Sequence, residues 1–338
     1  MSGALDGLRR IFLGDRIFKP RGSTQERTAT GLENEAPMSN QSGWGFTLRF
    51  LARDRAALVG LVIIGLFLGW GLVEGVMQYI ASYTHVASWG WALLPSDPIS
   101  LNLKNSLATP TLSNLNNLFG ANFEGQSVLS QLLYATPHDA TASVLVVASA
   151  IAIGMMIGIP AGYIGGWTDE ILMRITDAFL AFPYLVLAIA FSVLLGEGFT
   201  TVLLALVLIW WPTYARYFRA QAISLKNRNF VEASKLSGVG PLKIMLRHIF
   251  PNSIDPVIAQ ATLDFGSVIL LYSTLAFLGI GLELNYPEWG SMSSLGVSYF
   301  PASWWLVLVP GVTIMVIVVA FSLIGDRLQD LVAGRLTY

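Results

Sequence analysis

Long stretches without a charged residue recur along most of this chain, separated by shorter polar segments. A helix needs about 20 residues to cross the roughly 30 Å of hydrocarbon in a bilayer. Stretches of about this size occupy residues 56–73, 140–166, 178–196, 198–215, 265–282 and 303–325. Because an open strand would leave backbone groups without hydrogen bonds in lipid, these stretches are expected to form helices. The pattern predicts an all-α, polytopic membrane protein with six transmembrane helices.

Composition agrees with this prediction and excludes several kinds of chemistry. Of the 338 residues, 54% are hydrophobic and only 12% are charged, whereas a soluble domain carries about 25% charged residues. The net charge of −1 gives no reason to expect a nucleic-acid partner. Cysteine is absent, and His85, His138 and His248 lie far apart. The sequence therefore predicts no metal site, no catalytic residue and no enzyme activity, since an intramembrane protease would need a Ser–His pair within the spans.

Basic residues are distributed unevenly between the predicted spans. Nine Lys/Arg lie in residues 1–55 and seven in residues 216–247, whereas the segment 81–137 has one, Lys104, and the segment 285–302 has none. With six spans, the basic segments all fall on one side of the membrane. Since Lys and Arg are enriched in cytoplasmic loops, both termini are predicted to be cytoplasmic. The first residues lack the apolar core of a signal peptide, so the first span is expected to direct insertion.

This topology divides the chain into segments with separate roles. The predicted segments are a cytoplasmic tail (1–45), the first transmembrane helix with its lead-in (46–80), an extracytoplasmic loop (81–137), a core with five transmembrane helices (138–326), a cytoplasmic coupling loop within that core (223–255) and a cytoplasmic tail (327–338). Two interpretations of the first tail stay open. It is either disordered or forms a short amphipathic helix on anionic membrane lipid.

Small residues recur at four-residue spacing on two of the predicted spans. Gly154, Gly158 and Gly162 lie on the second span, and Gly65 and Gly69 on the first. Such faces allow helices to approach closely. They serve either packing inside this chain or contact with another subunit, and the first interpretation is favoured.

The polar segment between the fourth and fifth spans has signals for two short helices. Asn229 and Glu232 have the spacing of a capping box at the start of the first helix, over 230–237. Gly238 suits the left-handed position that ends it. Pro241 suits the first turn of a second helix, which is expected to stop near Phe250, before Pro251. Asp255 and Pro256 would then cap the fifth span.

The apolar side chains of these two short helices, which are joined at a glycine-rich elbow, are compatible with two binding surfaces. They either fill a groove on another protein or lie on the membrane surface. The physical pattern alone favours neither.

The same segment resembles the EAA loop of ABC importer permeases. The resemblance is carried by Glu232-Ala233-Ser234, by Gly238 and by the ending at residues 249–252. Ser234 and Phe250 stand where the family commonly has Ala and Leu. The resemblance implies that this loop contacts an ATPase, through the residues Glu232, Ala233, Ser234, Leu236, Gly238, Leu242, Arg247 and Pro251.

Most of the chain is similar to one subfamily, the permeases of dipeptide and oligopeptide importers, and to the shorter of the two partner permeases. The matching motifs are Trp44, Phe50 and Arg53; residues 164–170 with Arg174, Asp177 and 181–183; 211–212 with 214–216; 277–279; 289–290; and Phe321 with 325–326.

This resemblance implies a set of partners and a mechanism. The partners would be a homologous second permease, two cytoplasmic ATPase subunits and an extracytoplasmic substrate-binding protein. ATP binding would close the ATPase pair and rock the helices between inward-facing and outward-facing states. The chain contains no Gly-Lys dipeptide and hence no phosphate-binding loop. It therefore needs no cofactor of its own, and ATP and Mg are expected in the partner subunits.

Departures from the subfamily pattern bear on the cargo. Gln126 and Ser127 replace a usual Arg-Asp pair, and Tyr272 stands where an acidic residue is common. Asp264 lies in a predicted span, where an ionisable residue is either a functional site or a hydrogen-bonded structural group. Asp264 and Tyr272 are the candidates for the translocation path. Peptides are the expected cargo, with oligosaccharides as the alternative. A secondary transporter, which would show buried acid relays and an inverted repeat, is the alternative of another class.

Overall fold

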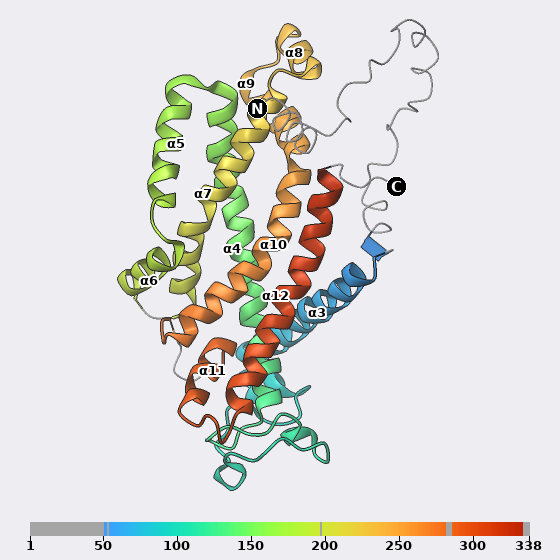
Figure 1. Cartoon of the computed structure of the whole chain (residues 1–338), viewed down its shortest axis with the longest axis vertical. Helices are drawn as coiled ribbons and strands as arrows, with labels where there is room; N and C mark the ends of the chain where they lie inside the picture. The colour runs from blue at the N-terminus through green and yellow to red at the C-terminus, as the bar shows by residue number, and fades with distance from the viewer. Residues whose placement is uncertain (1–50, 53, 197, 282–285, 334–338) are drawn as a thin grey trace, which may run out of the picture. The chain divides into compact units, whose positions relative to one another are not determined.

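The computed structural model describes residues 51–52, 54–196, 198–281 and 286–333. The predicted tail at 1–45 and the end of the predicted tail at 327–338 lie outside the described residues. Helices are labelled as in Figure 1, where α3 is the first label along the chain.

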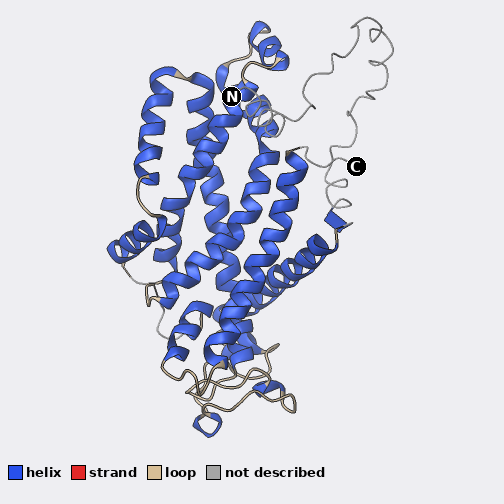
Figure 2. Ribbon diagram, viewed as in Figure 1, coloured by secondary structure: helices blue, strands red, loops and turns tan. Residues whose placement is uncertain are grey.

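The described residues form a helical bundle without a named β-strand (Figure 2). Five helical segments among them are long and apolar enough to cross a membrane. They are α3 (Arg55–Thr84), α4 (Val128–Ile164), α7 (Phe199–Leu225), the segment Pro241–Phe277 that ends in α10 (Phe250–Phe277), and α12 (Trp305–Val332). The predicted all-α membrane fold is confirmed.

Of the six predicted spans, the one at 178–196 differs most from the helices in the structure. The structure has α5 (Gly166–Leu180) and α6 (Tyr184–Leu195), bent by 88° at the break between them. Pro183 precedes α6 and has no backbone N–H, and the residue before a proline is disfavoured in helical conformation. The described residues therefore hold six spans when this bent pair counts as one, and the predicted third span is a broken pair of helices and not one helix over 178–196.

Helices extend further than the uncharged stretches that predicted them. α3 continues past Glu74 to Thr84, and α4 begins at Val128, so residues 128–137 of the predicted loop are helical. Ser127 caps α4 by accepting a hydrogen bond from the Ser130 amide. The rest of the loop holds short 3-10 turns at Ala87–Trp91, Leu103–Asn105 and Leu115–Asn117. A charged residue on the buried face of a helix interrupts the uncharged stretch in the sequence, but the helix itself continues past it. Most of the predicted spans are therefore shorter than the helices.

The closest helix pair in the bundle is α4 with α7, side by side in Figure 1. A Cβ on Gly154 or Gly158 would overlap atoms of α7 at Tyr214 and Ala215. A Cβ on Gly162 would lie 2.5 Å from the Arg219 carbonyl oxygen. This glycine face therefore serves packing inside the chain, as favoured from the sequence.

The glycines of α3 behave differently. A Cβ at Gly65 or Gly69 would meet no heavy atom within 4 Å. Within the described part of the chain, this face of α3 has no helix packed against it.

Ion pairs connect the ends of the helices. Arg219 of α7 holds Asp169 of α5 at 2.5 Å and 2.7 Å through two nitrogens. Arg327 near the end of α12 pairs with Asp54, which caps the start of α3. This last pair places the beginning of α3 beside the end of α12.

Candidate functional site

The predicted coupling loop forms two short helices that project from one end of the bundle (Figure 1). They are α8 (Asn229–Leu236) and α9 (Pro241–Ile244). Gly238 has φ +77°, and the amides of Gly238 and Val239 donate to the carbonyls of Lys235 and Ser234 at 3.0 and 3.1 Å. This is the left-handed ending that the sequence predicted.

The predicted start of α8 is wrong. Asn229 is the first helical residue, and Arg228 is the cap, with no side-chain capping bond. The Asn229–Glu232 capping box is therefore not formed. Glu232 lies in the first turn, where a carboxylate is favoured by the helix dipole, and this accounts for its helix-start signal.

The predicted stop before Pro251 is also wrong. α9 passes through a π-helical turn, Met245–Ile249, directly into α10. Pro251 lies in the first turn of α10 and Pro256 inside it, so Asp255-Pro256 is not a cap. A proline ring clashes with the carbonyl four residues before it, and the wider π turn lies where the Pro251 clash would fall. The second coupling helix is thus continuous with a transmembrane span.

Most of the predicted coupling residues are exposed on this projection. The Leu236 side chain is 91% exposed and that of Leu242 66%. The other exposed members of the set are Glu232, Ala233, Gly238, Arg247 and Pro251. Ser234 alone is partly buried. A leucine this exposed on a helix offers an apolar surface that no other described residue of the chain covers.

Behind this exposed face, the elbow is fixed to the bundle by buried apolar side chains. Val231, Ile244 and Ile249 are fully or almost fully buried in the core around α4 and α7. The Ser234 hydroxyl donates to the Phe230 carbonyl at 2.8 Å and lies 3.5 Å from Nε2 of His248. The projection is therefore a braced element, which is suited to transmitting a displacement.

Two lysines connect the elbow to the end of α4. The Lys226 Nζ donates to the Gly162 carbonyl at 3.1 Å. The Lys235 Nζ donates to the Lys226 carbonyl at 3.4 Å and lies 5.4 Å from the ring centroid of Tyr163. Cations are favoured at a helix C-terminus, and α4 ends at Ile164. A displacement of α8 would therefore be transmitted to α4 as well as to α10.

Asp264, a candidate for the translocation path, is buried in the bundle. Its side chain is 7% exposed, and Oδ1 accepts from Nε2 of Gln260 at 3.0 Å. The Tyr217 hydroxyl donates to Oε1 of Gln260 at 2.9 Å. Oδ2 of Asp264 has no hydrogen-bond partner among the described residues, so both interpretations of Asp264 stay open. Its role in a path stays a prediction.

Tyr272, the other path candidate, is also 7% exposed. Its ring stands edge-on to Phe199 at a centroid distance of 6.0 Å. The two candidates are eight residues apart on α10. Its role in a path likewise stays a prediction.

Three buried carboxyl groups at the loop end of the bundle were missed from the sequence. Glu74 of α3, Asp139 of α4 and Glu288 before α11 (Trp289–Val297) are 0%, 0% and 3% exposed. Neither oxygen of Asp139 has a hydrogen-bond partner among the described residues. A signal was present, since Glu74 and Asp139 each directly border an uncharged stretch. The described residues hold no group of acids and histidines arranged to bind a metal ion.

Glu288, one of these three buried acids, also caps a helix. Its Oε2 accepts from the Ser291 amide at 2.9 Å and caps α11. Burial raises the pKa of the Glu288 carboxyl to about 8, against the lowering effect of the amide hydrogen bonds. Burial of this kind favours the protonated form of the Glu288 carboxyl at neutral pH.

Comparison with known proteins identifies relatives across most of the chain. Residues 154–338 match the family described as binding-protein-dependent transport system inner membrane component. The dipeptide transport system permease protein DppC of Alkalihalophilus pseudofirmus is 33% identical over 301 residues, covering 88% of this chain and 93% of that protein. DppC of Haemophilus influenzae is 33% identical over 290 residues, covering 85% and 93%.

A relative with another named cargo has a similar identity over a shorter part of the chain. The nickel transport system permease protein NikC of Escherichia coli is 34% identical over 255 residues, covering 75% of this chain and 90% of that protein. Among solved structures, a chain of the MetNI methionine ABC transporter in an inward-facing conformation matches with a TM-score of 0.43 and 18% identity, over 57% of this chain and 93% of that chain.

Proposed function

Because the chain belongs to the binding-protein-dependent transport system inner membrane components, we propose that it is the permease subunit of an ATP-driven importer for di- or oligopeptides. The family places it in the cytoplasmic membrane as a multi-pass component and as a permease. The proposal adds the cargo, the source of energy and the partner subunits.

The observation that carries the energy coupling is the exposed apolar face of α8 on a braced elbow. Leu236 is 91% exposed, while Val231 on the same short helix is fully buried. A rigid helix seated in a groove of an ATPase subunit converts rotation of that subunit into motion of the helix bundle. Continuity of α9 with α10 gives this motion a direct route into the membrane. ATP and Mg belong to the ATPase subunits, since this chain has no phosphate-binding loop.

The remaining partners follow from the same family. A second, homologous permease would complete the translocation path, and a binding protein on the other side of the membrane would deliver the cargo. The basic residues of 216–247 support a cytoplasmic position for the elbow. The Arg327–Asp54 pair brings the start of α3 next to the end of α12, which agrees with both termini on that side.

Peptides are the proposed cargo because two relatives above are named for dipeptide transport. The nickel-transport relative shows that a scaffold of similar sequence identity serves another named cargo. The cargo is therefore tested directly, by screening the binding protein that co-purifies with the assembled transporter against dipeptides, oligopeptides, oligosaccharides and nickel. Binding of peptides supports the proposal, and binding of oligosaccharides or nickel alone contradicts it.

The coupling proposal is tested with Glu232→Arg in the reconstituted transporter. Glu232 is exposed, so this substitution reverses the charge of the side chain without disturbing a buried contact. Transport is expected to fall by about tenfold or more, which corresponds to about 1.4 kcal/mol of lost coupling. Membrane insertion and Tm should stay unchanged. The matched control is Glu170→Arg on α5, whose side chain is 51% exposed. Unchanged transport by Glu232→Arg would remove α8 from the coupling contact.

A further inference from the structure

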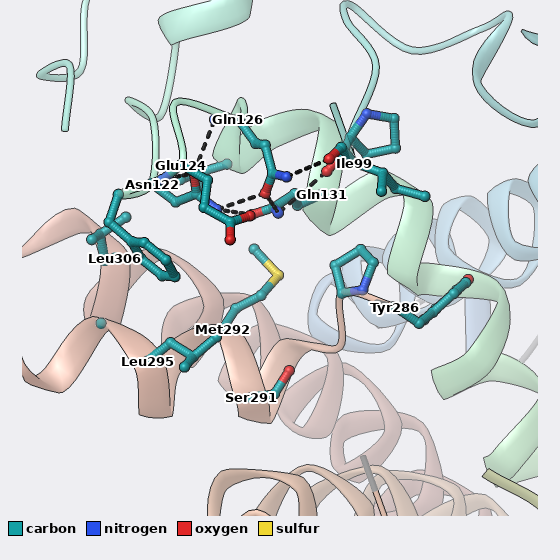
Figure 3. A pocket seen from close by; sticks show the side chains of 15 residues that line it. Ile99, Asn122, Glu124, Gln126, Gln131, Tyr286, Ser291, Met292, Leu295 and Leu306 are labelled. Atoms are coloured by element: carbon teal, nitrogen blue, oxygen red, sulfur yellow. Dashed lines mark hydrogen bonds between the residues drawn. The ribbon is translucent and has the colours of Figure 1, made fainter. Parts of the chain in front are cut away.

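A cavity of about 190 Å³ lies at the end of the bundle opposite to α8 and α9. One wall is polar and comes from residues 122–131, and the other comes from α11 and the start of α12 (Figure 3). The second wall is mainly apolar, with Met292, Leu295 and Leu306. An apolar cavity of about 150 Å³ holds a benzene molecule, so this one has room for a group the size of one side chain.

The amides of the polar wall satisfy one another. Nε2 of Gln131 donates to Oε1 of Gln126 at 2.6 Å, and Nε2 of Gln126 donates to the Ile99 carbonyl at 2.6 Å. Nδ2 of Asn122 also donates to Oε1 of Gln126, at 2.8 Å. These groups hold the wall in place and need no ligand.

Glu124 is the exception on this wall. Its backbone is fixed, because its carbonyl accepts from the Asn102 amide at 2.9 Å and its amide donates to Oδ1 of Asn122 at 3.0 Å. Its carboxylate makes no hydrogen bond or ion pair with another described residue, and it extends toward Met292 across the cavity in Figure 3. Among the described residues lining the cavity, it carries the one formal charge.

We propose that this cavity binds an alkylammonium or guanidinium group, with the cation on Glu124 and the aliphatic stem against Met292 and Leu295. A carboxylate forms strong, charge-assisted hydrogen bonds with such cations, and a long basic side chain packs its methylene groups on apolar surface. The lone carboxylate disfavours an anionic ligand. This assignment rests on the proposed function for the source of the ligand, which is a Lys or Arg side chain of the binding protein or the free amine of the cargo.

The chemistry of the cavity is tested first with small probes on the purified full chain. Nα-acetyl-lysine methylamide is compared with the uncharged norleucine analogue by calorimetry and thermal shift. The lysine probe is expected to bind about tenfold more tightly. Glu124→Gln should remove this preference, Glu124→Asp should keep part of it, and Glu170→Gln should leave it intact. Equal binding of the two probes, or a preference that survives Glu124→Gln, would overturn the proposal.

The source of the cation is then distinguished in the assembled transporter. With Glu124→Gln, weaker docking of the cargo-free binding protein assigns the site to a basic side chain of that protein. Unchanged docking with a lost preference for free over N-acetylated dipeptides assigns it to the cargo. No change in either would overturn a role of the site in transport. A wild-type complex that fails to assemble counts against the proposed function, while the probe experiment still decides the site.

Discussion

The two ends of the helix bundle are built differently. At the α8 end, Leu236 and Leu242 are exposed while the residues behind them are buried. At the other end, Gln126 and Gln131 bury their amides in hydrogen bonds with each other and with backbone carbonyls, and the exposed leucines there, such as Leu112, lie in loop segments and not on a braced helix. The first arrangement suits a permanent contact with another protein, and the second suits a folded cap with one small, charged cavity. Substitutions at the two ends should therefore fail in different ways.

The largest loss of folded protein is expected from a substitution in the α4–α7 contact, because both ends of the bundle depend on this packing. Gly158→Leu would force a side chain into the backbone of α7 at Ala215, and overpacking of this kind costs about 1–3 kcal/mol or more. We expect little folded protein, measured as the yield of monodisperse material in detergent. Gly65→Leu is the control, because a Cβ there meets nothing within 4 Å. Equal yields would contradict the close α4–α7 contact.

The next effect separates the two ends directly. Leu236→Asp places a charge in the proposed ATPase contact, and it should lower recovery of the ATPase subunit with the tagged chain by about tenfold. Tm should not change, because Leu236 is 91% exposed. Leu112→Asp, at a residue 93% exposed in the loop of the other end, is the control and should retain the ATPase. Loss of the ATPase in both variants would erase the distinction between the ends.

A smaller effect probes the buried acids of the loop end. Burial raises the pKa of Glu288 to about 8 from an unfolded value of 4.5, so the folded state holds the proton more tightly. Stability is then greatest below the unfolded pKa and is lost as the pH rises through the folded pKa. We expect Tm to fall by a few degrees between about pH 5 and about pH 8. Glu288→Gln, which retains an acceptor for the Ser291 amide, should flatten this slope. The same slope in both proteins would show that Glu288 does not hold the proton.

The smallest effect compares two ion pairs on α5. Asp169→Asn breaks the two-nitrogen pair with Arg219, whose side chains are 22% and 37% exposed, and should cost about 1 kcal/mol. Glu170→Gln breaks a pair with Arg174 that is 51% and 77% exposed, and should cost less than about 0.5 kcal/mol. Denaturant titration of the two variants measures both. A larger loss for Glu170→Gln would reverse the expected order.

The sequence predicted the membrane fold and the elbow because both depend on local signals. Uncharged length predicts spans, and Gly238 and Pro241 determine how the elbow turns. Helix ends that depend on tertiary packing were not predictable in this way. α3 passes Glu74 because that carboxyl faces Gln78 and α4 and not lipid. The π turn before Pro251 likewise lets a helix continue where a proline predicts a stop.

The candidate site was predicted unevenly for the same reason. The coupling residues lie within one short segment, so their spacing is visible in the sequence. Glu124 and Met292 line one cavity from segments far apart in the chain. No spacing rule connects such residues before the helices are packed.

α8 is proposed to form the contact with a separate ATPase subunit, and a crosslink tests this contact most directly. Because the chain has no cysteine, Leu236→Cys introduces a unique thiol at a residue 91% exposed. A thiol-to-amine crosslinker of about one side-chain length is applied to the co-expressed complex, with Leu112→Cys as the matched control. We expect a crosslink from residue 236 to a nucleotide-binding subunit and none from residue 112, in support of the proposed α8 contact. No crosslink from residue 236 in an intact complex, or equal crosslinking from both positions, would contradict it.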